Sequence, residues 1–273
     1  MKRTLLALHG LLGTPALFDV LGSKLRDHRL LALSLPGHGR PASTVPPTFE
    51  EAADVLAAQL GTQDPVDLVG YSLGGRLALA LLARHPGLVR RAVIVSAHPG
   101  LAGEDRAQRI AEDEAHAKLV EQHGLEAFVD EWERKPLFAS QARVAPHLLA
   151  NQRKARLSHE PAGIAASLRL HGLGRMPSYA TTIAEQAPRI ALLVGALDER
   201  FLGLAQRLRA ATPALAVETI PAAGHNPFLE EPLVTAARIE TLLGEDQPPI
   251  PRPVVGDGPS IRWQALRPPK ENT

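Results

Sequence analysis

The sequence contains no cysteine, no long apolar run and almost no net charge. The absence of cysteine excludes disulfide bonds, thiolate metal ligands and cysteine nucleophiles. No run approaches the ~20 apolar residues of a membrane-spanning helix, and the apolar stretch near the start is too short for a signal peptide. Lysine and arginine number 30 against 29 acidic residues, so no overall field attracts nucleic acid. We therefore expect a cytoplasmic protein with no membrane span, no nucleic-acid partner, no metal and no cofactor.

Short apolar runs alternate with helical patterns through the first hundred residues. Residues 4–10, 29–39, 66–70 and 90–97 are typical of buried strands, and the segments between them predict helices over 15–28, 49–60 and 73–85. Strands that are apolar on both faces and separated by helices are typical of a parallel sheet covered on both sides. The sequence therefore predicts an α/β fold with a mostly parallel central sheet flanked by helices.

The middle of the chain has a different pattern. Charged helical patterns follow one another over residues 102–187 without any strand-like run, and strand patterns return at 188–198 and 215–225, before a last helix over 228–243. We expect residues 1–101 and 188–243 to form the core and residues 102–187 to form an inserted helical cap, placed as a lid. The proline-rich segment 244–273 is predicted to be an extended or disordered tail.

The stretch GYSLG, residues 70–74, matches the pattern G-x-S-x-G between a predicted strand and a predicted helix. In that context the glycines permit a sharp turn that exposes Ser72 as a nucleophile or base. Asp198 and His225 each follow a later predicted strand, so all three residues are expected at the carboxyl edge of the sheet. His225 would accept the serine proton, and Asp198 would orient the imidazole and stabilise its charge.

The loop HGLLG, residues 9–13, follows the first predicted strand and can complete this site. The backbone N–H groups of Leu11 and Leu73 are the expected oxyanion-hole donors. His38, in the stretch LPGHGR, is interpreted as a structural residue of the neighbouring loop.

Taken together, LHG, LPGHG, GYSLGG, GALDERF and AGHN resemble the α/β-hydrolase fold. GYSLGGR, SAHPGL, WERKPLF, ANQRKARLS and AGHN resemble more specifically the 2-succinyl-6-hydroxy-2,4-cyclohexadiene-1-carboxylate synthases of menaquinone biosynthesis. The resemblance covers about residues 5–243. It implies a lyase that eliminates pyruvate from 2-succinyl-5-enolpyruvyl-6-hydroxy-3-cyclohexene-1-carboxylate, with Ser72 as the base and no acyl-enzyme.

The implied substrate is a small anion with three carboxylates, and the resemblance also implies how it is bound. Arg76, one helical turn beyond Ser72, can hold a carboxylate as a planar fork. Arg109 and Arg156 match cap positions that bind carboxylates in the family, and Tyr71 and Trp132 match pocket positions. We expect the three arginines to converge above Ser72.

Two positions depart from the family pattern, and two other functions stay open. Phe228 stands where family members often carry a second histidine. Glu133 stands where the family usually has tyrosine, so it either turns outward or marks a change in specificity. The same triad could instead serve a serine ester or thioester hydrolase acting through an acyl-enzyme on a small carboxylated substrate. A non-catalytic ligand receptor on this scaffold is the third alternative, which the intact triad disfavours.

Overall fold

The computed structural model describes residues 2–61 and 64–244. Within this part of the chain six parallel strands form one sheet in the order β2-β1-β3-β4-β5-β6. The strands are β1 (Arg3–Leu8), β2 (His28–Leu33), β3 (Val66–Tyr71), β4 (Val89–Val95), β5 (Ile190–Gly195) and β6 (Ala216–Ile220). The predicted parallel sheet is therefore confirmed. The predicted tail lies, from residue 245 onward, outside the described residues.

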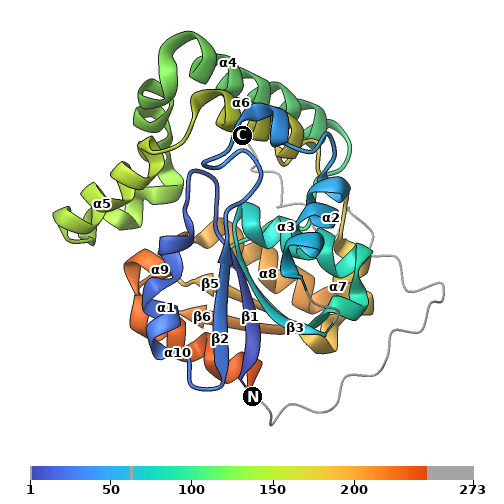
Figure 1. Ribbon diagram of the computed structural model, residues 1–273. Coiled ribbons are helices and arrows are strands. Elements are labelled where there is room, and N and C mark those ends of the chain that lie inside the picture. Colours follow the sequence, from blue (N-terminus) through green and yellow to red (C-terminus); the bar gives the residue numbers. More distant parts are fainter. Residues whose placement is uncertain (1, 62–63, 245–273) are drawn as a thin grey trace, which may run out of the picture.

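Helices cover both faces of the sheet (Figure 1). One face is covered by α1 (Asp19–Lys24) and α10 (Pro232–Leu243), the other by α2 (Phe49–Leu60), α3 (Leu73–Arg84), α7 (Ala180–Glu185) and α8 (Glu199–Ala211). Because side chains alternate along a strand, Leu5 and Ala7 join the first cluster, whereas Leu6 and Leu8 join the second. Shorter 3-10 helices are η1 (Pro15–Phe18), η2 (Ala42–Thr44), η3 (Pro86–Leu88) and η5 (Ala187–Arg189).

Two helices differ in extent from the prediction. The segment expected as one helix over 15–28 forms η1 and then α1, which ends at Lys24 before the chain enters β2. The last helix is split into α9 (Pro227–Glu230) and α10, which begins at Pro232. Proline has no N–H to continue the preceding helix, so it starts a new one instead.

The expected cap lies above the carboxyl ends of the strands (Figure 1), and its described secondary-structure elements are all helices. It contains α4 (Glu104–Glu133), η4 (Pro136–Arg143), α5 (Pro146–Leu157) and α6 (Pro161–His171). α4 is kinked at Gly124, whose φ of 85° is a conformation that glycine adopts easily. α4 and α6 share an apolar cluster that also takes in Leu12 from the loop after β1, so the cap is anchored directly on the predicted oxyanion loop.

The division of the chain at residues 101/102 and 187/188 stays a prediction. The packing of α7 argues for an earlier end of the cap, because Met176, Tyr179 and Ile183 belong to the apolar cluster around α3.

The order of the strands creates a crevice at the carboxyl edge. β1 and β3 are neighbours, but the chain leaves β1 towards β2 and leaves β3 towards β4 on the opposite side. Open α/β sheets bind their ligands at such a point. Among the described residues, no helix combines the length and the apolar character needed to span a bilayer.

Candidate active site

Ser72 occupies the sharp turn between β3 and α3. Its φ of 51° and ψ of −109° are strained for a residue with a side chain, as expected of an exposed nucleophile. The glycines around Ser72 are required because a side chain at these positions would collide with neighbouring backbone atoms. A Cβ on Gly74 would lie 2.1 Å from the carbonyl oxygen of Leu8, and one on Gly70 would lie 2.5 Å from that of Gly74. The predicted turn therefore exists, and its glycines allow strand, turn and helix to approach.

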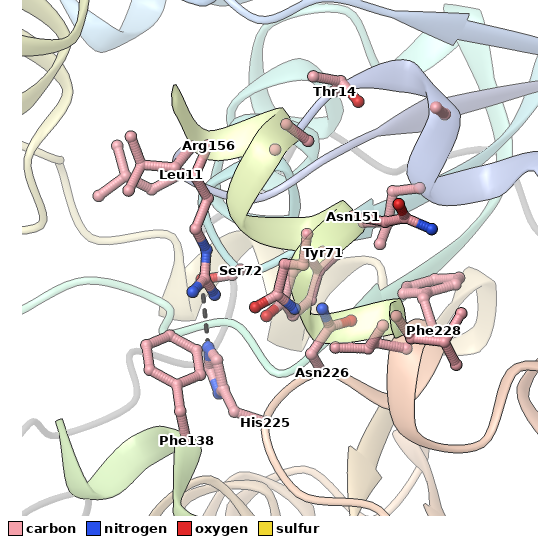
Figure 2. A pocket seen from close by; sticks show the side chains of 18 of the residues that line it. Leu11, Thr14, Tyr71, Ser72, Phe138, Asn151, Arg156, His225, Asn226 and Phe228 are labelled. Atoms are coloured by element: carbon pink, nitrogen blue, oxygen red, sulfur yellow. Dashed lines mark hydrogen bonds between the residues drawn. The ribbon is translucent and has the colours of Figure 1, made fainter. Parts of the chain in front are cut away.

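Asp198, His225 and Ser72 form a continuous hydrogen-bonded relay, of which Figure 2 shows the contact between His225 and Ser72. His225 Nδ1 lies 2.7 Å from Asp198 Oδ2, and His225 Nε2 lies 3.3 Å from Ser72 Oγ. Since a carboxylate can only accept, Nδ1 carries the proton and Nε2 is left to accept the serine proton. Both His225 and Asp198 are buried. Asp198 Oδ1 also accepts the Phe201 N–H at 3.3 Å, so the start of α8 helps to orient the carboxylate.

A histidine joins the loop after β1 to the loop after β2. Leu12, with a φ of 61°, donates its N–H to His38 Nε2 at 3.1 Å, and His38 Nδ1 donates to the carbonyl oxygen of Pro36. Burial lowers the pKa of His38 well below its usual value, which keeps Nε2 unprotonated and able to accept. His38 thus has the structural role that we expected, because it connects the backbone at Leu12 to the backbone at Pro36.

The predicted oxyanion donors flank Ser72. Leu11 lines the cavity beside the serine, and a Cβ placed on Gly10 would lie 3.4 Å from Ser72 Cβ, so the two loops are in contact. Leu73 begins α3, where the N–H groups have no partner within the helix and favour negative charge. The assignment of Leu11 and Leu73 as oxyanion donors stays a prediction that this arrangement supports.

A cavity of about 300 Å³ opens from Ser72 and His225. Figure 2 shows Arg156 near Ser72 and His225, whereas Asn151 and Phe228 lie farther from these two residues. Most of its lining is apolar, contributed in part by α1, α5 and α9. Among the described residues that line the cavity, Arg156 is the only arginine, lysine, aspartate or glutamate.

Arg156, Trp132 and Tyr71 all line this cavity, as the family resemblance implied. The Arg156 guanidinium is buried and lies over the Phe138 ring at 5.2 Å. The Trp132 ring lies 5.9 Å from the same phenylalanine. Burial raises the pKa of Tyr71, which keeps the phenol neutral.

Arg76 and Arg109 lie elsewhere. Arg76 Nη1 donates to the carbonyl oxygen of His171 at 3.0 Å and lies over the Phe49 ring, and Arg109 Nε donates to Asp113 at 2.8 Å. Burial, reinforced by the charge of Arg109, lowers the pKa of Arg76 to about 9. Only one of the three predicted arginines lines the cavity beside Ser72.

The side-chain direction explains this outcome for Arg76. The backbone places it one turn beyond Ser72, with its N–H bonded to the Ser72 carbonyl oxygen at 3.0 Å, as predicted. Its long side chain then extends to the carbonyl oxygen of His171 on α6. The spacing of residues near Ser72 gives no sign of this distant acceptor. Substrate contact by Arg76 and Arg109 stays a prediction.

Glu230 is a site residue that the sequence prediction missed. Its two carboxylate oxygens accept the N–H groups of Gly224 at 2.8 Å and Asn226 at 3.1 Å, one on each side of His225. The available signal was its place near the start of a helix four residues after Asn226, where a carboxylate can bind free N–H groups.

Asn226 itself has an unusual environment. The residue is buried, it lines the cavity, and its Oδ1 has no hydrogen-bond partner among the described residues. A buried carbonyl oxygen without a partner suits a ligand that can donate a hydrogen bond.

The chain belongs to the alpha/beta hydrolase family, whose sequence profile matches residues 5–238. The match covers both halves of the sheet and the helices between them.

Similar proteins carry one recurring name. A 2-succinyl-6-hydroxy-2,4-cyclohexadiene-1-carboxylate synthase from Pectobacterium atrosepticum is 32% identical over 88% of this chain and 93% of its own. A relative from Bacillus subtilis (strain 168) is 34% identical over 85% of this chain and 86% of its own, and carries the same name in provisional form. The solved structure of MenH from S. aureus has a TM-score of 0.83 and 30% identity, covering 88% and 93% of the two chains. The predicted resemblance is therefore confirmed.

Proposed function

We propose that this chain is a lyase that eliminates pyruvate from 2-succinyl-5-enolpyruvyl-6-hydroxy-3-cyclohexene-1-carboxylate in menaquinone biosynthesis. The observation that carries the proposal is the buried Ser72–His225–Asp198 relay beside a cavity-lining arginine, in a chain 30% or more identical to named synthases over most of its length. Fold alone would not distinguish this activity from others in the same family.

The relay suits removal of a ring proton. His225 Nε2 takes the Ser72 hydroxyl proton, and the serine oxygen then abstracts the ring proton that the neighbouring succinyl ketone makes acidic. Asp198 stabilises the imidazolium. The negative charge moves to the ketone oxygen, where the N–H groups of Leu11 and Leu73 hold it. As the enolate collapses, the ring C–O bond breaks and the enolpyruvyl group leaves as the enolate of pyruvate.

The substrate carboxylates need positive partners. Arg156 lies at the cavity wall next to the relay and can present its guanidinium to one carboxylate. Arg76 and Arg109 would serve the others after their side chains turn from their present acceptors. Tyr71 and Trp132 would pack against the ring.

The proposal also includes a small anionic substrate, no nucleic-acid partner and a cytoplasmic location. The chain has a net charge of +1, which provides no long-range attraction for nucleic acid.

The direct test supplies the purified chain with the enolpyruvyl cyclohexene carboxylate and follows pyruvate release. Ser72→Ala should lower kcat by at least about 1,000-fold without unfolding the protein, because the base is lost. The matched control is Ser43→Ala, an exposed serine in η2 outside the cavity, which should retain wild-type turnover. Near wild-type turnover by Ser72→Ala would exclude Ser72 as the base.

The apolar part of the cavity favours a second candidate, a serine hydrolase of small carboxylated esters or thioesters. Leu17, Val20, Leu148, Leu229 and Pro232 could receive an acyl group beside Ser72. Rapid stoichiometric labelling by a serine-trapping phosphonate, together with fast ester turnover and no pyruvate release, would support this candidate over the lyase.

A further inference from the structure

Arg156, the arginine at the cavity wall, already holds a carboxylate of the protein. Its Nη1 donates to Glu133 Oε1 at 2.9 Å, while Glu133 Oε2 accepts from Arg153 Nη1 at 2.9 Å. Glu133 is the last residue of α4, and the two arginines lie one turn apart on α5. One glutamate therefore bridges an arginine that faces the cavity and one that does not line it.

Carboxylates outnumber guanidinium groups around this pair. Arg153 Nη2 also lies 2.7 Å from Asp130 and 3.2 Å from Glu126. Together with Glu133, these acids recur at helical spacing along one side of α4 and face the two arginines of α5. Three carboxylates against two guanidinium groups give the cluster a net charge of −1.

Within this cluster, the pair of Arg156 and Glu133 lies where solvent screens charges weakly. The Arg156 side chain is 8% exposed and that of Glu133 is 28% exposed. A substrate carboxylate that approaches Arg156 must displace Glu133 or share the guanidinium with it, and in both cases it meets a like charge.

We infer that Glu133 is a specificity-determining residue, which competes with a substrate carboxylate for Arg156 and weakens the binding of polyanionic substrates. The inference rests on the proposed function, in which Arg156 binds such a carboxylate. Arg153 lets the exchange occur, because it keeps one oxygen of Glu133 paired when Arg156 turns to the ligand. Glu133 thereby lowers affinity for the bound anion without touching Ser72, His225 or Asp198.

The first test is Glu133→Gln, which keeps the size and one accepting oxygen but removes the charge. For pyruvate release, KM should fall about 10-fold, equivalent to about 1.4 kcal/mol, while kcat changes less than about 2-fold. The matched control is Glu126→Gln, which removes the same charge from the same cluster but touches Arg153 and not Arg156. Its KM should change less than about 2-fold. An unchanged KM in Glu133→Gln overturns the inference, and a raised KM shows instead that Glu133 orients Arg156 for binding.

The second test does not depend on turnover. Calorimetric titration with propane-1,2,3-tricarboxylate should give a Kd for Glu133→Gln about 10-fold below that of the wild-type protein, with Glu126→Gln close to wild type. Equal Kd values, or no binding by any of the three proteins, overturn the inference. If the wild-type chain releases no pyruvate but this titration gives the expected order, the proposed function fails and the competition at Arg156 stands.

Discussion

Replacing Glu230 with alanine should slow catalysis without greatly changing substrate binding. The carboxylate accepts the N–H groups of Gly224 and Asn226, and these two bonds bracket His225 in the loop after β6. Glu230 itself does not line the cavity, so it acts on the reaction only through the position of His225.

The magnitude follows from the two bonds. A hydrogen bond to a charged group contributes about 1.5–3 kcal/mol, and because Glu230 is only half-buried we take the lower value, about 3 kcal/mol for the pair. Without them the loop can shift by a fraction of an ångström to an ångström, which lengthens the 3.3 Å contact between His225 Nε2 and Ser72 Oγ. Since a misplacement of about 1 Å can cost about 100-fold, we expect kcat to fall about 10- to 100-fold and KM to change less than about 3-fold.

The assay is pyruvate release at several substrate concentrations. Glu230→Gln retains one accepting oxygen and should give an intermediate kcat, which a general loss of stability would not predict. The control is Glu231→Gln, since the Glu231 side chain precedes α10 without making a capping hydrogen bond to it. An unchanged kcat in Glu230→Ala, or an effect on KM alone, would refute a positioning role for this carboxylate.

Two further predictions concern buried cationic and imidazole groups. Arg76→Ala should lower kcat/KM about 10- to 100-fold by removing a charge-assisted bond to substrate, and kinetics equal to wild type would make Arg76 a structural residue only. Acidification should destabilise the fold, because burial lowers the pKa of both His9 and His171 from 6.5 to about 4. Between these values the unfolded chain binds more protons, so the free energy of unfolding, measured in urea, should fall as pH drops from 6.5 to 4, by up to about 3 kcal/mol per histidine. A flat profile over that range would contradict the burial of neutral imidazoles.

The sheet and most of its helices could be predicted because their signals are local. Apolar runs such as Val66–Tyr71 and the pattern of Phe49–Leu60 reflect the periods of strand and helix directly. The errors in extent lie at a helix end, where local signals are weakest, and at a proline inside a predicted helix. The last helix divides at Pro232, and the helix predicted to reach residue 28 ends at Lys24 because β2 begins there.

The candidate site was predictable where chemistry follows a motif. Ser72, Asp198 and His225 all follow strands, and parallel strands deliver their carboxyl ends to one edge of the sheet, so the relay could be expected from chain order. Glu230 was missed because its carboxylate contacts the site only by accepting two backbone N–H groups of the loop around His225. Such a role leaves only a weak trace in residue types.

The sequence by itself indicated the strained turn at Ser72, because the G-x-S-x-G pattern is local and a Cβ on Gly70 would collide with the Gly74 carbonyl oxygen four residues away. The close approach of Gly74 to the Leu8 carbonyl oxygen of β1 comes from the tertiary structure. Where the long cationic side chains point was decided by the tertiary structure alone. Arg76 donates to the carbonyl oxygen of His171 on α6, and Arg156 on α5 donates to Glu133 on α4. An arginine has many rotamers of similar energy, so its direction depends on which acceptor the rest of the fold brings within reach.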